Sequence, residues 1–366
     1  MRWLRRPLRK IASLALMFPI FIAVLLPMFR FAATTRETQS AETAAGAGAT
    51  FATVAEQQVH YRAWGPESGR PLLLIHGTLA WAETFRDIAA PLAAKGYRVI
   101  APDLPPFGFS DRPVGHDYSR TGQAKRILAF ATAMGLDRFT LGVHSYGGGA
   151  AVEAAFAEPE RIDGLILLDV ALGLGQEPKS APWVLRASSD VRDLIVASTL
   201  TNPVATGLGL KAFIADDSIV TTERIDLYRR PFVMRGTTTA IGRWLLTSLF
   251  RDESKTAASN PARYEAFEPP VLVVWGREDS ITPLAQGEAI AASLANAKLE
   301  VLEGVNHIPH VEKPAEVVAL IDAFMRTLPG APPDPATEKR DRVVRSAPLP
   351  TSGTPATSAP VSTPSP

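Results

Sequence analysis

The chain has 366 residues, 46% of them hydrophobic and 20% charged, a composition typical of a globular protein with one large core or two modest ones. Its 38 basic and 37 acidic residues leave a formal net charge of +1, which provides no overall electrostatic attraction to nucleic acid. The chain has no cysteine, which excludes disulfides, thiolate nucleophiles and cysteine metal sites.

The N-terminus has the composition of a membrane anchor. Five basic residues fall within residues 1–10, and residues 11–29 follow without a single charge. At about 1.5 Å per residue, this stretch is just long enough to cross a hydrocarbon core of about 30 Å. We therefore expect a single transmembrane helix, with the basic segment in the cytoplasm and the rest of the chain outside it. The alternative is a cleaved signal peptide, which would give a secreted protein.

Two segments of biased composition flank the central part of the chain. Residues 30–50 are rich in Ala, Thr, Gly and Glu, and we expect them to form a linker. Residues 329–366 are rich in Pro, Ser, Thr and Ala, which bury too little apolar surface to offset the entropy of ordering. We therefore expect a disordered tail there, and neither segment carries a candidate reactive group.

Short apolar runs alternate with helix-like stretches over residues 51–170 and 265–328. The runs cover 72–75, 97–101, 139–143, 164–169, 271–275 and 298–302. Because they are apolar on both faces, they indicate buried strands of a mainly parallel sheet. The helices expected between them cover Ala124–Met134, Ala150–Ala157, Leu284–Leu294 and Pro314–Met325. Together with an antiparallel hairpin near Val54–Trp64, this alternation predicts an α/β fold whose core has two parts.

The alternation stops over residues 171–264. This span contains several helix-like segments and scattered aromatic residues, but no strong strand pattern. It directly follows a predicted strand, and ligands of open α/β sheets bind at the carboxyl ends of the strands. We therefore expect a helical cap inserted over that edge of the sheet.

A serine among small residues follows the third core strand, in the sequence Leu-Gly-Val-His-Ser-Tyr-Gly-Gly-Gly at 141–149. Only half of the pattern G-x-S-x-G is present, because Val143 occupies the place of the first glycine. From this stretch alone, Ser145 is either a nucleophile on a sharp turn or a loop serine. If the turn forms, we expect it to be slightly opened around Val143, with Gly142 and Gly147 making room.

Serine catalysis needs a base within hydrogen-bond reach and a carboxylate that orients this base. His307 lies just past the last strand, where a loop can reach across the strand ends to Ser145, and His310 is the local alternative. Asp279 follows the preceding strand and is the candidate acid, with Glu278 as its neighbour and alternative. No set of histidines and carboxylates has metal-ligand spacing, so we expect no metal and no cofactor.

Three other residues provide alternatives or support. Asp169 ends a core strand and could orient the base from there. Asp103 and Ser110 are more suited to fixing a loop than to reacting.

Five motifs in chain order resemble those of the α/β-hydrolase superfamily, over residues 54–328 without the insertion. They are His-Gly-Thr at 76–78, Asp-Leu-Pro-Pro-Phe-Gly-Phe-Ser at 103–110, His-Ser-Tyr-Gly-Gly at 144–148, Gly-Arg-Glu-Asp at 276–279 and Asn-His-Ile-Pro-His at 306–310. The second motif departs from the family pattern, because Pro106 replaces the usual glycine. The resemblance implies the α/β-hydrolase fold with a helical cap.

The resemblance also implies the roles of particular residues. Ser145 would be the nucleophile, His307 the base and Asp279 its orienting acid. The backbone N–H groups of Thr78 and Tyr146 would form the oxyanion hole.

These expectations lead to an extracytoplasmic, membrane-tethered serine hydrolase that cleaves a small apolar carboxylic ester through an acyl-enzyme. Amide hydrolysis and the cleavage of carbon–carbon bonds in dienones by the same triad are alternatives. A non-catalytic binding protein on the hydrolase fold is the alternative from another class. The expected partners are a small-molecule substrate and the membrane, but not nucleic acid. The substrate and the oligomeric state have no signature in the sequence.

Overall fold

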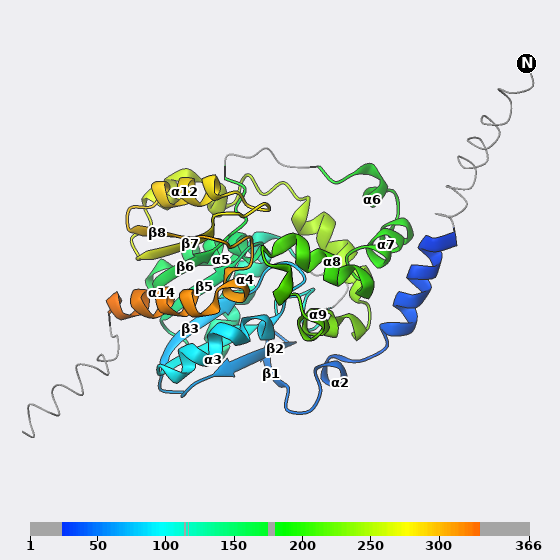
Figure 1. The fold of residues 1–366 in the computed structure, drawn as a ribbon, viewed down its shortest axis with the longest axis horizontal. Coiled ribbons are helices and arrows are strands. Elements are labelled where there is room, and N and C mark those ends of the chain that lie inside the picture. Colours follow the sequence, from blue (N-terminus) through cyan, green and yellow to red (C-terminus); the bar gives the residue numbers. More distant parts are fainter. Residues whose placement is uncertain (1–23, 113–114, 116, 175–179, 330–366) are drawn as a thin grey trace, which may run out of the picture. The chain divides into compact units, whose positions relative to one another are not determined.

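The computed structural model describes residues 24–112, 115, 117–174 and 180–329. Within them, eight strands form one sheet in the order β1-β2-β4-β3-β5-β6-β7-β8 (Figure 1). Strands β3 to β8 are parallel to one another, and β2 is antiparallel to both of its neighbours, β1 and β4. The mainly parallel sheet predicted from the sequence is therefore confirmed.

The predicted core strands are all present, close to their expected bounds. The eight strands cover Thr50–Val54 (β1), Gln57–Trp64 (β2), Arg70–Ile75 (β3), Tyr97–Pro102 (β4), Phe139–His144 (β5), Ile162–Leu168 (β6), Val271–Gly276 (β7) and Ala297–Leu302 (β8). The hairpin begins earlier than expected, at Thr50. Its tight turn consists of Ala55 and Glu56, whose φ angles of 46° and 67° are those of a two-residue hairpin turn.

Helices cover both faces of the sheet (Figure 1). Helices Arg120–Ala133 (α4), Gly147–Ala157 (α5) and Leu284–Ser293 (α12) contribute to one apolar core, and Arg86–Ala94 (α3) and Pro314–Thr327 (α14) contribute to the other. Along β6, Leu165 and Leu167 belong to the first core, whereas Ile166 and Leu168 belong to the second. This alternation explains why the strands are apolar on both faces.

Between β6 and β7 the described residues form helices and no strand. The main helices cover Trp183–Ala187 (α6), Ser189–Ser198 (α7), Pro203–Phe213 (α8), Thr222–Arg229 (α9), Thr237–Trp244 (α10) and Pro261–Glu265 (α11). Ser188, Asn202 and Thr221 start three of them, because each side chain accepts a hydrogen bond from a backbone N–H of the first turn. We refer to residues 180–265 as the helical insertion.

The segment expected to be a linker is instead folded against the helical insertion. Residues 24–36 are helical, and a short helix, α2, covers Ala41–Ala45. Glu37 is 7% exposed, and its carboxylate accepts a hydrogen bond from the backbone N–H of Thr238 at 3.0 Å. The prediction of a linker over 30–50 is therefore wrong, because the polar residues among the alanines have specific partners in the insertion.

Most of the predicted membrane span lies outside the described residues. Of residues 11–29, only 24–29 are described, and they belong to the helix that continues to residue 36. Among the residues that the structure describes, no helix is both long enough and apolar enough to cross a bilayer. The basic segment 1–10 is not described, and of the predicted tail only Pro329 is.

Candidate active site

Ser145 occupies a sharp turn between β5 and α5. Its φ angle is +52°, in the left-handed region that residues other than glycine rarely adopt. Backbone hydrogen bonds hold this conformation: Ser145 N–H donates to the Leu168 carbonyl at 3.1 Å, and the Ser145 carbonyl accepts from Gly148 and Ala171 at 2.9 Å each. Of the two alternatives left open by the sequence, the structure shows the sharp turn that a nucleophile of this kind requires.

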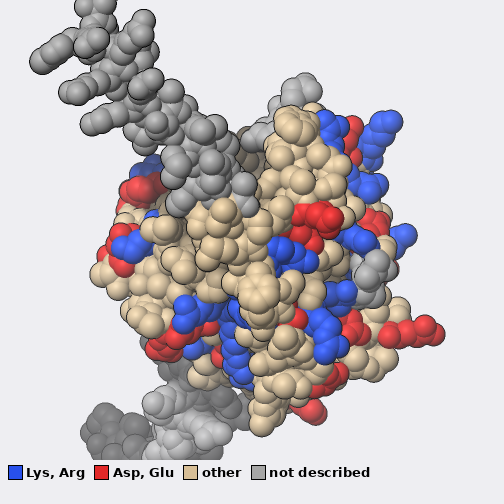
Figure 2. Space-filling model, turned by 90° about the vertical axis from the view of Figure 1, so that its right-hand side faces the viewer, with Lys and Arg blue, Asp and Glu red and all other residues tan. Residues whose placement is uncertain are grey.

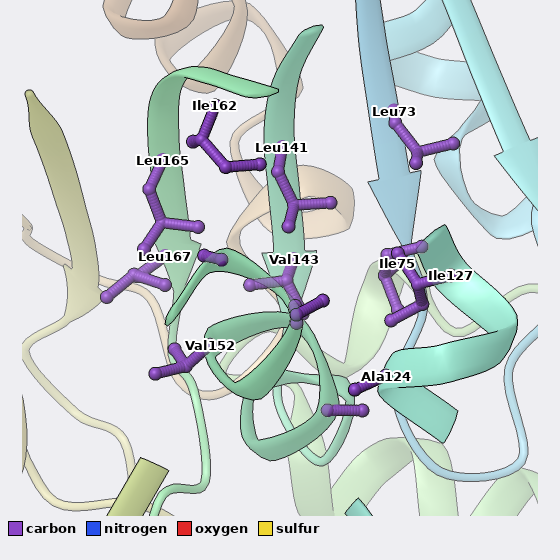
Figure 3. Packing of buried hydrophobic residues seen from close by; sticks show 14 of the residues in the cluster. Leu73, Ile75, Ala124, Ile127, Leu141, Val143, Val152, Ile162, Leu165 and Leu167 are labelled. Atoms are coloured by element: carbon purple, nitrogen blue, oxygen red, sulfur yellow. The ribbon is translucent and has the colours of Figure 1, made fainter. Parts of the chain in front are cut away.

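Val143 fits beside this turn because residue 147 has no side chain. Val143 is fully buried and points into the apolar core that α5 covers (Figure 3). A Cβ atom at Gly147 would lie 3.1 Å from Val143 Cγ2 and 2.5 Å from the His76 carbonyl oxygen. The turn is therefore closely packed, and the slight opening expected around Val143 stays a prediction. Gly142 makes room for Leu74, since a Cβ there would lie 2.7 Å from Leu74 Cδ2.

The structure brings the three predicted catalytic side chains into one chain of hydrogen bonds. Ser145 Oγ lies 2.8 Å from His307 Nε2, and His307 Nδ1 lies 2.9 Å from Asp279 Oδ2. The residues follow β5, β8 and β7, so they meet at the carboxyl edge of the sheet. With a carboxylate at Nδ1, the neutral imidazole carries its proton there, and Nε2 accepts from the Ser145 hydroxyl.

Asp279 is held by donors from the turn that follows it. Its Oδ1 accepts from the backbone N–H groups of Ile281 and Thr282 at 2.8 Å each, and its Oδ2 accepts from the Thr282 hydroxyl at 2.6 Å. Burial raises the pKa of Asp279, but interactions with His307, Asp169 and Thr282 outweigh burial and lower the pKa below its usual value. Asp279 is therefore ionised at neutral pH and can stabilise an imidazolium.

Two of the sequence alternatives support loops. The ring of His310 packs against those of His144 and Phe85, with centroids 4.6 and 4.8 Å apart, and burial lowers the pKa of His310 to about 3. Glu278 accepts a hydrogen bond from Val305 N–H at 3.0 Å and so holds the loop after β8. Within the described chain, neither side chain hydrogen bonds to Ser145.

Asp169, the third alternative, lies beside the catalytic chain of hydrogen bonds. It is fully buried, and its φ angle is +42°. Its Oδ1 accepts from Gly276 N–H at 2.8 Å, whereas its Oδ2 accepts no hydrogen bond among the described residues. Burial and the neighbouring Asp279 carboxylate raise the pKa of Asp169 well above its usual value.

Asp169, Asp279 and His307 have ligand atoms within 4.8 Å of one another, and no other described group has the spacing of metal ligands. His307 and Asp279 already bond to each other through atoms that would bind such an ion. The cluster is therefore better suited to orienting a histidine than to holding a metal.

The backbone groups predicted to form an oxyanion hole flank Ser145. Gly77 packs so closely that a Cβ there would lie 2.9 Å from Ser145 Cβ, and Thr78 is the next residue. Tyr146 follows the serine at the start of α5. In the part of the chain that is described, the N–H groups of Thr78 and Tyr146 donate to no protein acceptor. Donors of an oxyanion hole need to be unpaired in this way, and the assignment of these two groups to that role stays a prediction.

Two further histidines fix the neighbouring loops. His76 Nδ1 donates to the Gly77 carbonyl at 2.9 Å, while its Nε2 accepts from Leu104 N–H at 2.9 Å. His144 Nε2 donates to the carbonyl of His307 at 2.8 Å. Burial lowers the pKa of both His76 and His144. Both rings are therefore neutral, and His144 connects the residue before Ser145 to the backbone of His307.

Asp103 and Ser110 fix a loop, as the sequence suggested. The Asp103 carboxylate accepts from His60 Nδ1 and from the backbone N–H groups of Ala82 and Phe109, at 2.7 to 2.8 Å. Ser110 Oγ donates to the Asp103 carbonyl at 2.7 Å. Pro106, which departs from the family motif, follows a cis peptide bond in the same loop.

The helical insertion reaches the site from two sides. At the end of α8, the carbonyl of Phe213 accepts from His307 N–H at 3.0 Å, and the two rings are 5.5 Å apart. Beside Ser145, the ring of Tyr146 packs edge-on against Trp244 at 5.0 Å. Tyr146 and Leu79 also pack against an apolar cluster formed by Phe107, Tyr118, Leu185, Val196, Ile241, Trp244 and Leu245. On this side of Ser145 the surroundings are therefore mostly apolar.

The sequence is similar to those of known hydrolases. The family described as alpha/beta hydrolase fold matches residues 70–314. The chain is 29% identical over 266 residues to a 2-hydroxymuconate semialdehyde hydrolase of Pseudomonas sp. (strain CF600), covering 70% of this chain and 87% of that protein. It is 28% identical over 274 residues to Lipase 1 of Psychrobacter immobilis, covering 72% and 79%.

Solved structures give the same fold. A meta-cleavage product hydrolase from Pseudomonas fluorescens superposes with a TM-score of 0.61 at 24% identity, covering 76% of this chain and 97% of that one. The fold, the carboxyl-edge site and the match over residues 70–314 agree with one another. This chain therefore belongs to the α/β-hydrolase fold family, and its activity class is that of a hydrolase.

Proposed function

We propose that this hydrolase cleaves carboxylic esters through an acyl-enzyme on Ser145. The chain of hydrogen bonds from Ser145 through His307 to Asp279 carries the proposal. His307 Nε2 takes the hydroxyl proton as Ser145 Oγ attacks the acyl carbon, and Asp279 stabilises the resulting imidazolium. The oxyanion accepts hydrogen bonds from the N–H groups of Thr78 and Tyr146. His307 then protonates the leaving alcohol, and water activated by His307 releases the acyl group.

The surroundings of Ser145 support a small apolar ester as the substrate. Tyr146 and Leu79 pack against an apolar cluster that includes Phe107, Ile241 and Trp244. A neutral acyl chain suits such surroundings. One relative is named a lipase and another a semialdehyde hydrolase, so cleavage of a carbon–carbon bond by the same triad is the second candidate.

A substrate panel with Ser145→Ala as the matched control tests this proposal. The panel contains acyl esters of graded chain length, amides and dienones. We expect the highest kcat/KM with short esters and a loss of about 10⁴-fold or more in Ser145→Ala. A dienone as the best substrate would select the second candidate. The absence of turnover on every substrate would favour a non-catalytic binding protein.

We also propose that residues 11–29 anchor the protein in a membrane, with the hydrolase outside the cytoplasm. Val24, Met28 and Phe31 are 55%, 59% and 70% exposed, and their spacing places them on one face of a helix. On the same helix, Arg30 pairs with Asp193 of the insertion at 3.1 Å. Figure 2 views the side on which this helix lies in Figure 1, and uncharged residues cover much of the centre of that view. An apolar exposed face continuous with an uncharged segment supports the anchor.

Membrane extraction tests the anchor. A reporter fused after residue 50 is expected to be active only outside the cytoplasm, and the protein should stay in the membrane during alkaline extraction. Release of a shortened protein into the soluble fraction would instead show a cleaved signal peptide.

A further inference from the structure

Glu312 is a half-buried carboxylate close to the loop of the proposed base, and no step of the proposed reaction uses it. It ends the short helix Pro309–Glu312 (α13), five residues after His307. Its Oε2 accepts a hydrogen bond from Asn306 N–H at 3.1 Å, and its Oε1 accepts one from Ile308 N–H at 3.0 Å. Glu312 therefore holds the backbone on both sides of His307.

The same carboxylate also reaches the helical insertion. Glu312 Oε2 accepts from the N–H of Ala215, two residues past the end of α8, at 2.7 Å. This oxygen thus has one donor from the base loop and one from the insertion. Between its two neighbours, His307 N–H donates to the Phe213 carbonyl at 3.0 Å. The three consecutive N–H groups of residues 306–308 are therefore all used where the base loop meets the insertion.

The side chain of Asn306 makes a further connection at this place. Its Nδ2 donates to the Ala212 carbonyl in α8 at 3.2 Å, and its Oδ1 accepts from Ser280 N–H at 2.9 Å. Ser280 directly follows the orienting acid, Asp279. Hydrogen bonds therefore join the loop of the base, the loop of the acid and the end of α8. We refer to the segments that Glu312 connects as the junction, which consists of residues 212–215, residues 306–308 and Glu312.

We propose that Glu312 is a positioning residue, which fixes the orientation of His307 and couples it to the position of the helical insertion. The proposal rests on the proposed role of His307 as the base. A base that is displaced by about 1 Å loses much of its effect, so the backbone on both sides of it needs firm partners. Because the same carboxylate binds the end of α8, a substrate that displaces α8 also displaces His307. Only a substrate that fits under the insertion leaves the base in place.

Glu312→Gln in the full-length protein, measured by ester hydrolysis, tests this proposal. Glutamine has nearly the same shape, but it replaces one acceptor oxygen with an NH₂ donor that faces a backbone N–H group. We expect kcat per folded molecule to fall by about tenfold and KM to rise by about threefold, because the base and the insertion are both released. In a His307→Ala background, the effect on the residual kcat is expected to be absent, since Glu312 acts through His307. A purely structural role would lower only the folded fraction.

Hydrogen exchange of the backbone amides gives a readout that does not depend on activity. In Glu312→Gln, we expect exchange to accelerate by about tenfold or more in both segments of the junction, 212–215 and 306–308, because the carboxylate connects them. Glu316→Gln is the matched control, since Glu316 lies one turn further along the chain and pairs with Lys313 at 3.0 Å. This control is expected to leave exchange in the junction, kcat and KM unchanged.

Three results would each overturn the proposal: kcat and KM of Glu312→Gln equal to those of the wild type, faster exchange in only one of the two segments, or a loss of kcat that persists in full in the His307→Ala background. Thermal unfolding checks each variant. Glu312→Asp, whose side chain is one methylene shorter, replaces Glu312→Gln if the latter does not fold. Ester hydrolysis that continues in Ser145→Ala would instead refute the proposed function, whereas failure of the Glu312 tests alone leaves that function intact.

Discussion

Replacing Thr282 with valine tests how firmly the orienting acid is held. The Thr282 hydroxyl donates to Asp279 Oδ2 at 2.6 Å and lies 3.3 Å from His307 Nδ1, and Thr282 is 4% exposed. Valine has nearly the same shape but no donor. A hydrogen bond to a charged group contributes about 1.5–3 kcal/mol, and Asp279 retains its other donors. We therefore expect the free energy of unfolding to fall by about 1.5 kcal/mol.

The same substitution changes the pH dependence of stability in a defined direction. The pKa of Asp279 is lower in the folded protein than in the unfolded chain. Its ionisation therefore stabilises the fold at any pH above the pKa of the unfolded chain. This contribution is lost as the pH falls through the pKa of the folded protein. Without the Thr282 donor, the folded pKa rises. The variant is therefore less stable than the wild type at neutral pH, and its stability decreases less than that of the wild type when the pH is lowered.

Urea unfolding at several pH values and ester hydrolysis are the two assays. If the whole of this stabilisation of ionised Asp279 is also lost in the transition state, kcat/KM falls by about tenfold, because about 1.4 kcal/mol corresponds to a factor of ten. Thr282→Ser retains the hydroxyl and is the matched control, with both quantities expected near those of the wild type. Unchanged stability and unchanged kcat/KM in Thr282→Val would refute this reasoning.

Two other substitutions test the packing behind the nucleophile. Val143→Gly restores the usual family motif but removes a fully buried side chain from a central strand. We therefore expect urea unfolding to show a loss of about 3 kcal/mol in stability, while kcat/KM per folded molecule changes little. Unchanged stability would contradict the close packing of Val143. His144→Leu removes the donor to the buried His307 carbonyl, and we expect a loss of about 1–3 kcal/mol in stability and a lower kcat/KM. His144→Gln should recover part of both, and activity of the Leu variant equal to the wild type would show that this link does not position the base.

The fold and the members of the candidate triad could be predicted because each leaves a local pattern. The core strands are apolar over most of their length, since neighbours such as Leu165 and Ile166 face different cores. Ser145, Asp279 and His307 each follow a recognisable strand, and parallel strands place such residues at one edge of the sheet. The missing glycine at 143 did not prevent the sharp turn at Ser145, where both Gly142 and Gly147 occupy positions that would crowd a Cβ atom.

The contacts that the sequence did not reveal depend on how distant segments meet. Thr282 was missed, although a threonine three residues after Asp279, in a turn closed by proline, is a signal that could have identified it. The bond from His144 to the His307 carbonyl has no local signature. The linker prediction failed for the same reason, since Glu37 finds its partner at Thr238, far along the chain.

Covalent labelling of the purified full-length protein with a fluorophosphonate, located by peptide mass spectrometry, tests the central claim most directly. The reagent reacts with a serine that an adjacent base activates, so the geometry at 2.8 Å between Ser145 Oγ and His307 Nε2 predicts one adduct, on Ser145. Labelling should disappear in Ser145→Ala and fall strongly in His307→Ala. Absence of labelling in the folded wild type, or equal labelling in Ser145→Ala, would contradict the assignment of Ser145 as the nucleophile.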